Sequence, residues 1–416
     1  MNTNPLRTSF KFVHAADLHL DSPLKNLRLK EAQTADEIAR ATRSAFVGLI
    51  DLCLERQVDF LLLSGDIYDG DWSSMSVGIF FVEQLARLKS AGISVYIIQG
   101  NHDAESRISK DFRGLVGDRG HFFDSEKASS VSVPGLNVTI HGQSFAQPAV
   151  TDNLAKHYPA PKSGAYNIGM LHTALEGGNR HAPYAPCTVS ELVAKGYDYW
   201  ALGHVHDAAV LHTVPHVVFS GVLQGRSIRE QGPKGAYLCT VEDGVLAEHE
   251  FVELSTVRWV QVEISVQTDW SLNQTLDALK QVIEHEFQAA QGTPIALRIE
   301  FSRNLEVDQE DLEAQVQLVL SEISPTGLWL EAIRFAKQIE RASLPDSSAI
   351  RELIDDMTHD EEDFIAQALS SMQDKLPALL RTSEELAYVD DRSLEEWKAV
   401  GIEYLERRMH DPGNVK

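Results

Sequence analysis

Short apolar runs alternate with amphipathic stretches over the first 250 residues of the chain. The short runs are bounded by polar or glycine-containing segments, which is typical of buried strands. They lie at 12–16, 60–64, 95–99, 138–141, 168–171 and 200–202. Apolar residues three and four positions apart predict helices over 35–55 and 76–89 and a shorter helix over 188–195. This alternation predicts a layered α/β domain.

The pattern changes near residue 212, where strands follow one another without intervening helices. Three are predicted, at 217–219, 235–241 and 249–254. We expect these strands to complete the first domain, which then spans residues 1–256.

A second alternation of strands and helices begins near residue 257. Its strands and helices are predicted, in order, at 258–266, 271–291, 294–301, 309–321 and 328–334. We interpret residues 257–345 as a small α/β cap domain. Residues 346–416 hold 18 acidic and 8 basic residues and are helix-prone. Their periodic apolar positions predict a helical tail that binds a partner protein.

Composition narrows the class of protein. The chain has 416 residues, of which 43% are hydrophobic and 24% charged, as in soluble globular proteins. Its longest apolar runs fall far short of the roughly 20 residues that cross a membrane, and no signal peptide is recognised, so we expect a cytoplasmic protein. The net charge of −24 argues against coating nucleic acid by bulk charge, although two bound divalent cations would offset about four of these charges.

Five polar islands each follow a predicted strand. They are Asp17-Leu18-His19, Gly65-Asp66, Gly100-Asn101-His102-Asp103, His172, and Gly203-His204-Val205-His206. Ligand-binding groups project from the carboxyl ends of strands in α/β sheets, so the islands can converge on one cleft. Asp, Asn and His suit borderline cations such as manganese, iron or zinc, whereas magnesium or calcium prefers oxygen alone. Each island by itself is also typical of a turn, but the set predicts a dinuclear metal site.

The motifs Asp-x-His, Gly-Asp-x-x-Asp, Gly-Asn-His-Asp, His and Gly-His-x-His occur in this order. They resemble the signature of the calcineurin-like metallophosphoesterases. More narrowly, residues 11–335 are similar to the SbcD family of DNA repair exonucleases, and segments 14–22, 184–187 and 224–230 resemble its YhaO branch. The resemblance implies a β-sandwich flanked by helices, followed by the cap and the tail.

The resemblance also implies a role for each island. The first metal would be held by Asp17, His19, Asp66 and His206. The second would be held by Asn101, His172, His204 and the shared Asp66. Two Mn²⁺ ions are expected, with iron or zinc as alternatives, and a hydroxide between them would be the nucleophile. His102 would stabilise the developing charge or protonate the leaving oxygen, and Asp103 would orient His102.

Other polar residues are harder to interpret. Some relatives have histidine where this chain has Asp69, so their strand polarity is not carried over. His14 is read either as support for the metal site or as a buried structural histidine. Six other histidines are expected on the surface or in turns: His121, His141, His157, His181, His212 and His216. Arg226 and Arg229 are expected to bind substrate phosphate, since arginine suits bidentate phosphate contacts. The alternative for these arginines is a salt bridge to Glu230 or a turn at the end of a strand.

The leading interpretation is a metal-dependent DNA nuclease that works with a coiled-coil ATPase of the SbcC or YhaN type in a DNA repair complex. A cyclic-nucleotide or other small phosphodiesterase would use the same metal site. A non-catalytic subunit that binds DNA ends is the third interpretation, but it has no chemical need for the full ligand set. By the same resemblance, a homodimer is expected to form through the helix at 35–55 or the helix at 76–89.

Overall fold

The computed structural model describes residues 6–20, 22, 40–69, 75–105, 114, 116–175, 184–305 and 307–336. Residues 1–336 belong to one compact unit. The predicted tail, 346–416, lies outside the described residues, as does the start of the helix predicted over 35–55. Among the described residues, no helix is both long and apolar enough to cross a membrane.

Six strands form the first sheet, in the order β12-β11-β1-β2-β3-β4. Their bounds are β1 Phe10–Ala15, β2 Phe60–Ser64, β3 Ser94–Ile98, β4 His121–Phe122, β11 Gly235–Glu242 and β12 Val245–Glu253. The first four strands of the chain run parallel, and β11 and β12 are added antiparallel. Helices α2 (Ala41–Glu55) and α3 (Met75–Ser90) pack against each other and cover one face.

The second sheet has the order β5-β6-β7-β8-β10-β9. Its strands are β5 Ser129–Ser132, β6 Val138–Gly142, β7 Tyr166–His172, β8 Tyr199–Gly203, β9 Ala209–Thr213 and β10 His216–Phe219. The four central strands are parallel, and β5 and β9 are antiparallel edges. The outer face is covered by α6 (Val189–Ala194) and by the 3₁₀ helix η2 (Leu154–His157). Two further short helices are α4 (Asn101–Glu105) and η1 (Gly117–Arg119).

The two sheets pack face to face because alternate residues of their strands point inward. Phe12 of β1 stacks on Phe60 of β2 with ring centroids 5.2 Å apart, and both share a buried cluster with Ile168 of β7. Their neighbours Val13 and Leu61 point to the other face and pack beneath α2 and α3. The first domain is therefore a β-sandwich flanked by helices, as the resemblance implied.

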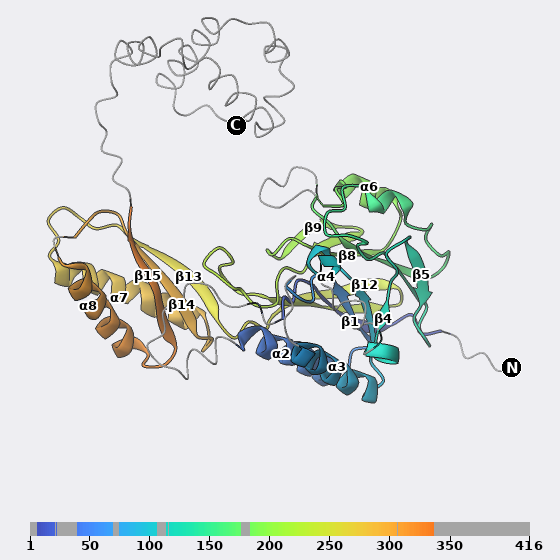
Figure 1. The fold of residues 1–416 in the computed structure, drawn as a ribbon, viewed down its shortest axis with the longest axis horizontal. Coiled ribbons are helices and arrows are strands. Elements are labelled where there is room, and N and C mark those ends of the chain that lie inside the picture. Colours follow the sequence, from blue (N-terminus) through green and yellow to red (C-terminus); the bar gives the residue numbers. More distant parts are fainter. Residues whose placement is uncertain are drawn as a thin grey trace, which may run out of the picture. The chain divides into compact units, whose positions relative to one another are not determined.

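A separate parallel sheet of three strands, β13-β14-β15, follows in the chain. Its strands are β13 Arg258–Ile264, β14 Ile295–Phe301 and β15 Leu328–Phe335, with helices α7 (Leu272–Ala289) and α8 (Gln309–Ile323) packed against it (Figure 1). These elements have their own core, in which Leu279, Ile283 and Val316 are fully buried. A small α/β unit was predicted here; its boundaries at 257 and 345 stay predictions.

A small cluster joins this cap to the sandwich. Trp259 and Ala296 of the cap sheet pack with Ala41, Ile228 and Val257. The contact therefore involves the start of α2 and the connection between β10 and β11.

The sequence pattern missed the strands β4, β5 and β9. They are short edge strands, so few of their residues are buried and the apolar signal is weak. The expectation for His141 was wrong, because its ring is buried and stacks on Tyr197 with centroids 4.3 Å apart.

Candidate metal centre

The polar islands meet at the carboxyl ends of strands from both sheets. Asp17 and Asp66 follow β1 and β2, and His172 ends β7. Hydrogen bonds between backbone and side-chain groups tie the two sheets together at this edge. The amide of His204 donates to both carboxylate oxygens of Asp17 at 3.1 and 3.0 Å, and Nδ1 of His172 donates to the carbonyl of Ser64 at 3.0 Å.

The backbone here adopts a conformation that most residues avoid. The φ angles of Asp17, His19, Asp66 and His204 are 51°, 41°, 51° and 98°, in the left-handed region. Hydrogen bonds hold these turns, since the amide of Asp17 donates to Gly65 and the amide of His19 donates to the carbonyl of Asp66. Such strain is concentrated at functional sites, where it aims side chains in one direction.

Three groups of potential metal ligands result: two consist of predicted ligands, and the third is formed by His19, Asp69 and His102. Asp17, His19 and His206 each offer one atom within 4.8 Å of the others, and Asp66, His172 and His204 do the same. Asp66 lies close to both groups: its Oδ2 is 3.4 Å from Nε2 of His172 and 3.9 Å from Nε2 of His19. Asn101 joins the second group, with its Oδ1 3.1 Å from Nε2 of His172.

Burial and charge shift the titration of these groups. Burial raises the pKa of Asp17 to about 6 and lowers the pKa of His19 to about 4. Burial alone would raise the pKa of Asp66, but the charge of His172 and their mutual hydrogen bond lower it well below its usual range. Burial would also lower the pKa of His172, but Asp66 raises it to about 9. In the metal-free chain, Asp66 therefore favours its ionised form and His172 its protonated form.

The donor set fits divalent cations. Within the described residues, both ring nitrogens of the buried His19 are without a hydrogen-bond partner, which is costly unless another group binds them. Nε2 of His172 faces oxygens of both Asn101 and Asp66 at 3.1 and 3.4 Å. Atoms bound to one cation at about 2.1 Å lie roughly this far apart. The site therefore has the histidine and aspartate ligands typical of a dimetal centre.

His102 lies at the edge of this centre, with 37% of its side chain exposed. Its Nδ1 is 3.3 Å from Oδ1 of Asp69, and Asp69 also lies 3.4 Å from Nδ1 of His19. The close contact with His19, the hydrogen bond from Ser22 and the charge of Arg226 lower the pKa of Asp69 below its usual range. Asp69, whose role the sequence left open, is therefore an ionised neighbour of both histidines.

Asp103 was expected to orient His102, but in the structure its carboxylate contacts backbone amides. The Asp103 carboxylate accepts hydrogen bonds from the amides of Ile67, Tyr68 and Gly100 at 3.0–3.2 Å. It is fully buried, and burial together with the charge of Asp66 raises its pKa to about 7. Asp103 thus holds the loop that carries Asp66. Asp103 and His102 are adjacent residues of α4, and side chains of adjacent helical residues do not face each other.

The expected substrate arginines differ in their surroundings. Nη2 of Arg226 lies 3.0 Å from Oε1 of Glu230, so the salt bridge considered as the alternative for Arg226 is formed. The exposed Arg229 donates its amide to Oγ of Ser227. Substrate binding by either arginine stays a prediction.

Sequence reasoning missed Glu230 as a neighbour of the metal centre. Its Oε1 accepts a hydrogen bond from Nδ1 of His206 at 2.8 Å. Burial would raise the pKa of Glu230, but the hydrogen bond from His206 and the charge of Arg226 lower it. The spacing of the sequence gives no signal for this pair, because Glu230 and His206 lie on different loops.

His14 is a structural residue of the sandwich. It is fully buried, its Nε2 donates to the carbonyl of Leu202 at 3.2 Å, and its Nδ1 lies 3.1 Å from the hydroxyl of Tyr199. Burial, with a smaller effect of His249, lowers its pKa to about 3. A neutral His14 therefore ties β1 to β8 just before the first ligand pair.

Comparisons with known proteins agree with this chemistry. The model of the calcineurin-like phosphoesterases matches residues 10–208. The chain is 34% identical over 299 residues to YhaO of Bacillus subtilis, which is called an uncharacterized metallophosphoesterase; the match covers 70% of this chain and 71% of YhaO.

More distant similarity extends to DNA repair proteins. The DNA double-strand break repair protein Mre11 of Methanopyrus kandleri is 29% identical over 286 residues, which is 61% of this chain and 58% of that protein. A dimetal phosphatase from Danio rerio of known structure aligns with 60% of this chain and 98% of its own, with 12% identity and a TM-score of 0.37.

Proposed function

This chain belongs to the calcineurin-like phosphoesterases, and from this premise we propose that it is a metal-dependent nuclease that hydrolyses phosphodiester bonds in DNA. The observation that carries the proposal is the pair of ligand groups around Asp66, with His102 beside them. The similarity to Mre11 repair proteins supports DNA as the substrate. The similarity spans 58% of the Mre11 chain, so DNA is proposed rather than carried over as a property of the whole protein.

We assign Asp17, His19 and His206 to one cation and Asn101, His172 and His204 to the other, with Asp66 shared. The grouping of these atoms within 4.8 Å supports the assignment, as does the position of Asp66 near both groups. Manganese is the proposed metal, since mixed nitrogen and oxygen donors suit borderline cations; iron and zinc fit the same donors. Metal analysis of protein purified without a chelator distinguishes the three.

When bound, the two cations supply Lewis acidity and activate water for attack at phosphorus. The chain itself supplies the proton transfer. Nδ1 of His102 lies 3.3 Å from Oδ1 of Asp69, and this contact orients the ring so that Nε2 can donate a proton to the leaving oxygen. We therefore propose Asp69, in place of Asp103, as the residue that orients His102.

Cleavage of end-labelled single- and double-stranded DNA with added Mn²⁺ tests the proposal. We expect His102→Ala to lower the rate by about 10²- to 10⁴-fold, the usual contribution of general acid catalysis. The exposed His157, at the end of η2, provides a matched control, and His157→Ala should leave the rate unchanged. Bis-p-nitrophenyl phosphate and cyclic AMP are run beside DNA.

Each outcome decides between the interpretations. Manganese-dependent degradation of DNA that is lost in His102→Ala supports the nuclease. Hydrolysis of the small diesters alone replaces the nuclease with a small phosphodiesterase. The absence of all hydrolysis, with metal bound, contradicts an active isolated subunit and favours a DNA-end-binding subunit of an ATPase complex.

The partner in this proposal is a coiled-coil ATPase of the SbcC or YhaN type. The region expected to bind it, 346–416, lies outside the described residues. Co-purification of the ATPase with the full chain, and its loss after removal of residues 346–416, is the expected result. Retention of the ATPase by the shortened chain would place the contact elsewhere.

A further inference from the structure

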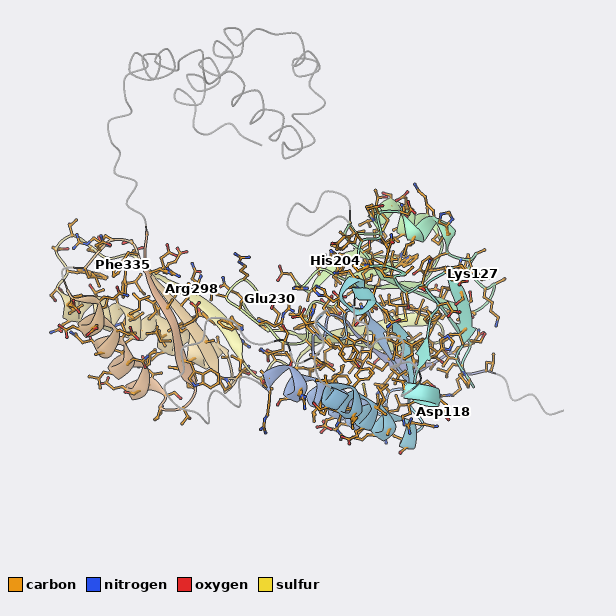
Figure 2. All side chains as sticks on the ribbon, viewed as in Figure 1. Asp118, Lys127, His204, Glu230, Arg298 and Phe335 are labelled. Carbon is orange, nitrogen blue, oxygen red and sulfur yellow. The ribbon has the colours of Figure 1, made fainter. Side chains whose placement is uncertain are left out.

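Glu230, labelled in Figure 2, lies on the connection between β10 and β11. Only 12% of its side chain is exposed. Its Oε1 is 2.8 Å from Nδ1 of His206, within the range of a strong charge-assisted hydrogen bond. Glu230 therefore contacts a proposed metal ligand without belonging to either ligand group.

This contact fixes the tautomer of His206. An ionised carboxylate only accepts hydrogen bonds, so Nδ1 of His206 must carry the proton. In a neutral imidazole the lone pair then lies on Nε2. Metal-binding histidines commonly have this arrangement, in which one ring nitrogen donates to an acceptor and the other binds the ion.

Because Arg226 also lies near His206, the contact of His206 with Glu230 is needed to keep the proton on Nδ1. Nη2 of Arg226 lies 3.4 Å from the same Nδ1 of His206, and a guanidinium can only donate. Without Glu230, Arg226 would favour a bare Nδ1 and a proton on Nε2. That tautomer has no lone pair on Nε2 for a cation. Nδ1 of His206 lies 2.8 Å from Glu230 and 3.4 Å from Arg226. The closer contact with Glu230 therefore favours the proton on Nδ1.

Arg226 instead holds Glu230 in place. Its backbone amide donates to Oε2 at 2.7 Å, and its Nε and Nη2 contact Oε2 and Oε1 at 3.4 and 3.0 Å. Nη1 reaches Oγ of Ser22 at 3.4 Å, and Ser22 donates to Asp69. Both oxygens of Glu230 are thus engaged on the side of Arg226.

The loop itself is anchored to the start of the cap. Oε1 of Gln224 accepts from the amides of Thr256 and Val257 at 2.8 and 3.2 Å, and the indole of Trp259 donates to the carbonyl of Gly225 at 2.9 Å. These bonds fix the residues immediately before Arg226. The carboxylate of Glu230 therefore approaches His206 from a rigid support.

We propose that Glu230 is a positioning residue that keeps the proton of His206 on Nδ1 and so directs the lone pair of Nε2 to the metal centre. Arg226 holds Glu230 for this task. The inference rests on the proposed role of His206 as a metal ligand, and it is independent of whether DNA is the substrate.

The unmodified chain tests the tautomer. In metal-free protein with ¹⁵N-labelled histidine at about pH 8, where unperturbed histidine is neutral, two-bond ¹H–¹⁵N correlations distinguish protonated from bare ring nitrogens. The signals of His206 are identified by their loss in His206→Gln. We expect the proton on Nδ1. A proton on Nε2 would overturn the proposal, and this measurement does not depend on the folding of a Glu230 variant.

Metal titration by calorimetry tests the consequence. We expect Glu230→Gln to weaken one of two Mn²⁺ equivalents by about 10- to 100-fold, as removal of such partners does in other metal sites. Glu230→Asp should restore part of the loss. Glu253 pairs with Arg258 as Glu230 pairs with Arg226, so Glu253→Gln is the matched control and should bind both equivalents normally. Unchanged affinity in Glu230→Gln would contradict the proposal.

One more variant separates this inference from the assignment on which it rests. If His206→Ala binds both equivalents as tightly as the unmodified chain, His206 is not a ligand and the assignment itself fails. If His206→Ala weakens one equivalent and Glu230→Gln does not, only the positioning role fails.

Discussion

Gly100 lies where the backbone approaches the side chains of two proposed ligands most closely. A Cβ at this position would overlap the carboxylate of Asp66 and lie 2.7 Å from Nε2 of His172. Nearby, the positive φ angles of Asp17 and Asp66 cost about 1–3 kcal/mol each. These residues therefore serve the metal centre at the expense of stability.

We expect Gly100→Ala to weaken metal binding by more than about tenfold and to lower the free energy of unfolding by about 1–3 kcal/mol, since the added methyl has no space. Gly114 has open space at the same position, so Gly114→Ala is the control. Metal titration and urea unfolding measure the two effects. Normal metal affinity in Gly100→Ala would contradict the close approach.

The buried His14 predicts a pH dependence of stability. Its pKa of about 3 lies below the ordinary value of 6.5, so the unfolded chain binds a proton that the folded chain excludes. Stability should therefore fall as the pH decreases from about 6.5 towards 3, by up to about 1.4 kcal/mol per pH unit from this group. His249, 3.3 Å from the Tyr199 hydroxyl and with a pKa lowered to about 4 by burial, acts in the same direction.

Unfolding of the metal-free protein between pH 7.5 and 5.5 measures this effect. His14→Gln should show a shallower dependence of its unfolding free energy on pH than the unmodified chain. His157→Gln, at an exposed position, should keep the original slope. Equal slopes in all three proteins would show that His14 does not contribute.

At the scale of elements, the metal centre and the cap depend on different cores. The proposed ligands stand on strand ends of the two sandwich sheets, whereas α7 and α8 pack on the cap sheet. In α8, Leu320 is buried with 2% exposure, and Leu318 in the same helix is 60% exposed. Substitutions at these two positions therefore test whether the stability of the cap affects metal binding at the centre.

We expect Leu320→Ala to destabilise the protein by about 2–5 kcal/mol, the usual cost of a buried leucine truncated to alanine. Leu318→Ala should change stability by less than about 0.5 kcal/mol. Both variants should bind Mn²⁺ normally below their unfolding temperatures, because α8 contributes no proposed ligand. Urea unfolding and calorimetry check these expectations, and a loss of metal affinity in Leu320→Ala would show that the cap shapes the centre.

At the scale of the whole molecule, the net charge of −24 and the buried carboxylates both favour bound cations. A ligand that binds only the folded state stabilises it by about 2.7 kcal/mol at one hundred times its Kd. We therefore expect Mn²⁺ to raise the unfolding temperature and a chelator to reverse the rise. Asp66→Asn should lose this response, whereas Asp118→Asn, at an exposed position paired with Lys89, should retain it. A full response in Asp66→Asn would contradict a shared ligand.

The sequence by itself determined most of the fold and the chemical type of the site. Strands such as β2 were predicted at their observed bounds, because buried strands leave a local apolar run. The polar islands were also predictable, since each directly follows such a run and the carboxyl ends of parallel strands meet at one edge. Residue types in these islands, with their spacing, were enough to indicate metal chemistry.

Only the tertiary structure decided which side chains support these residues. It placed Asp69 beside His102 and turned Asp103 towards the backbone of the Asp66 loop. It also brought Glu230 to His206 and Arg226 to Glu230. These contacts depend on loop conformation and on side chains from distant parts of the chain, which local patterns of apolar and polar residues do not encode.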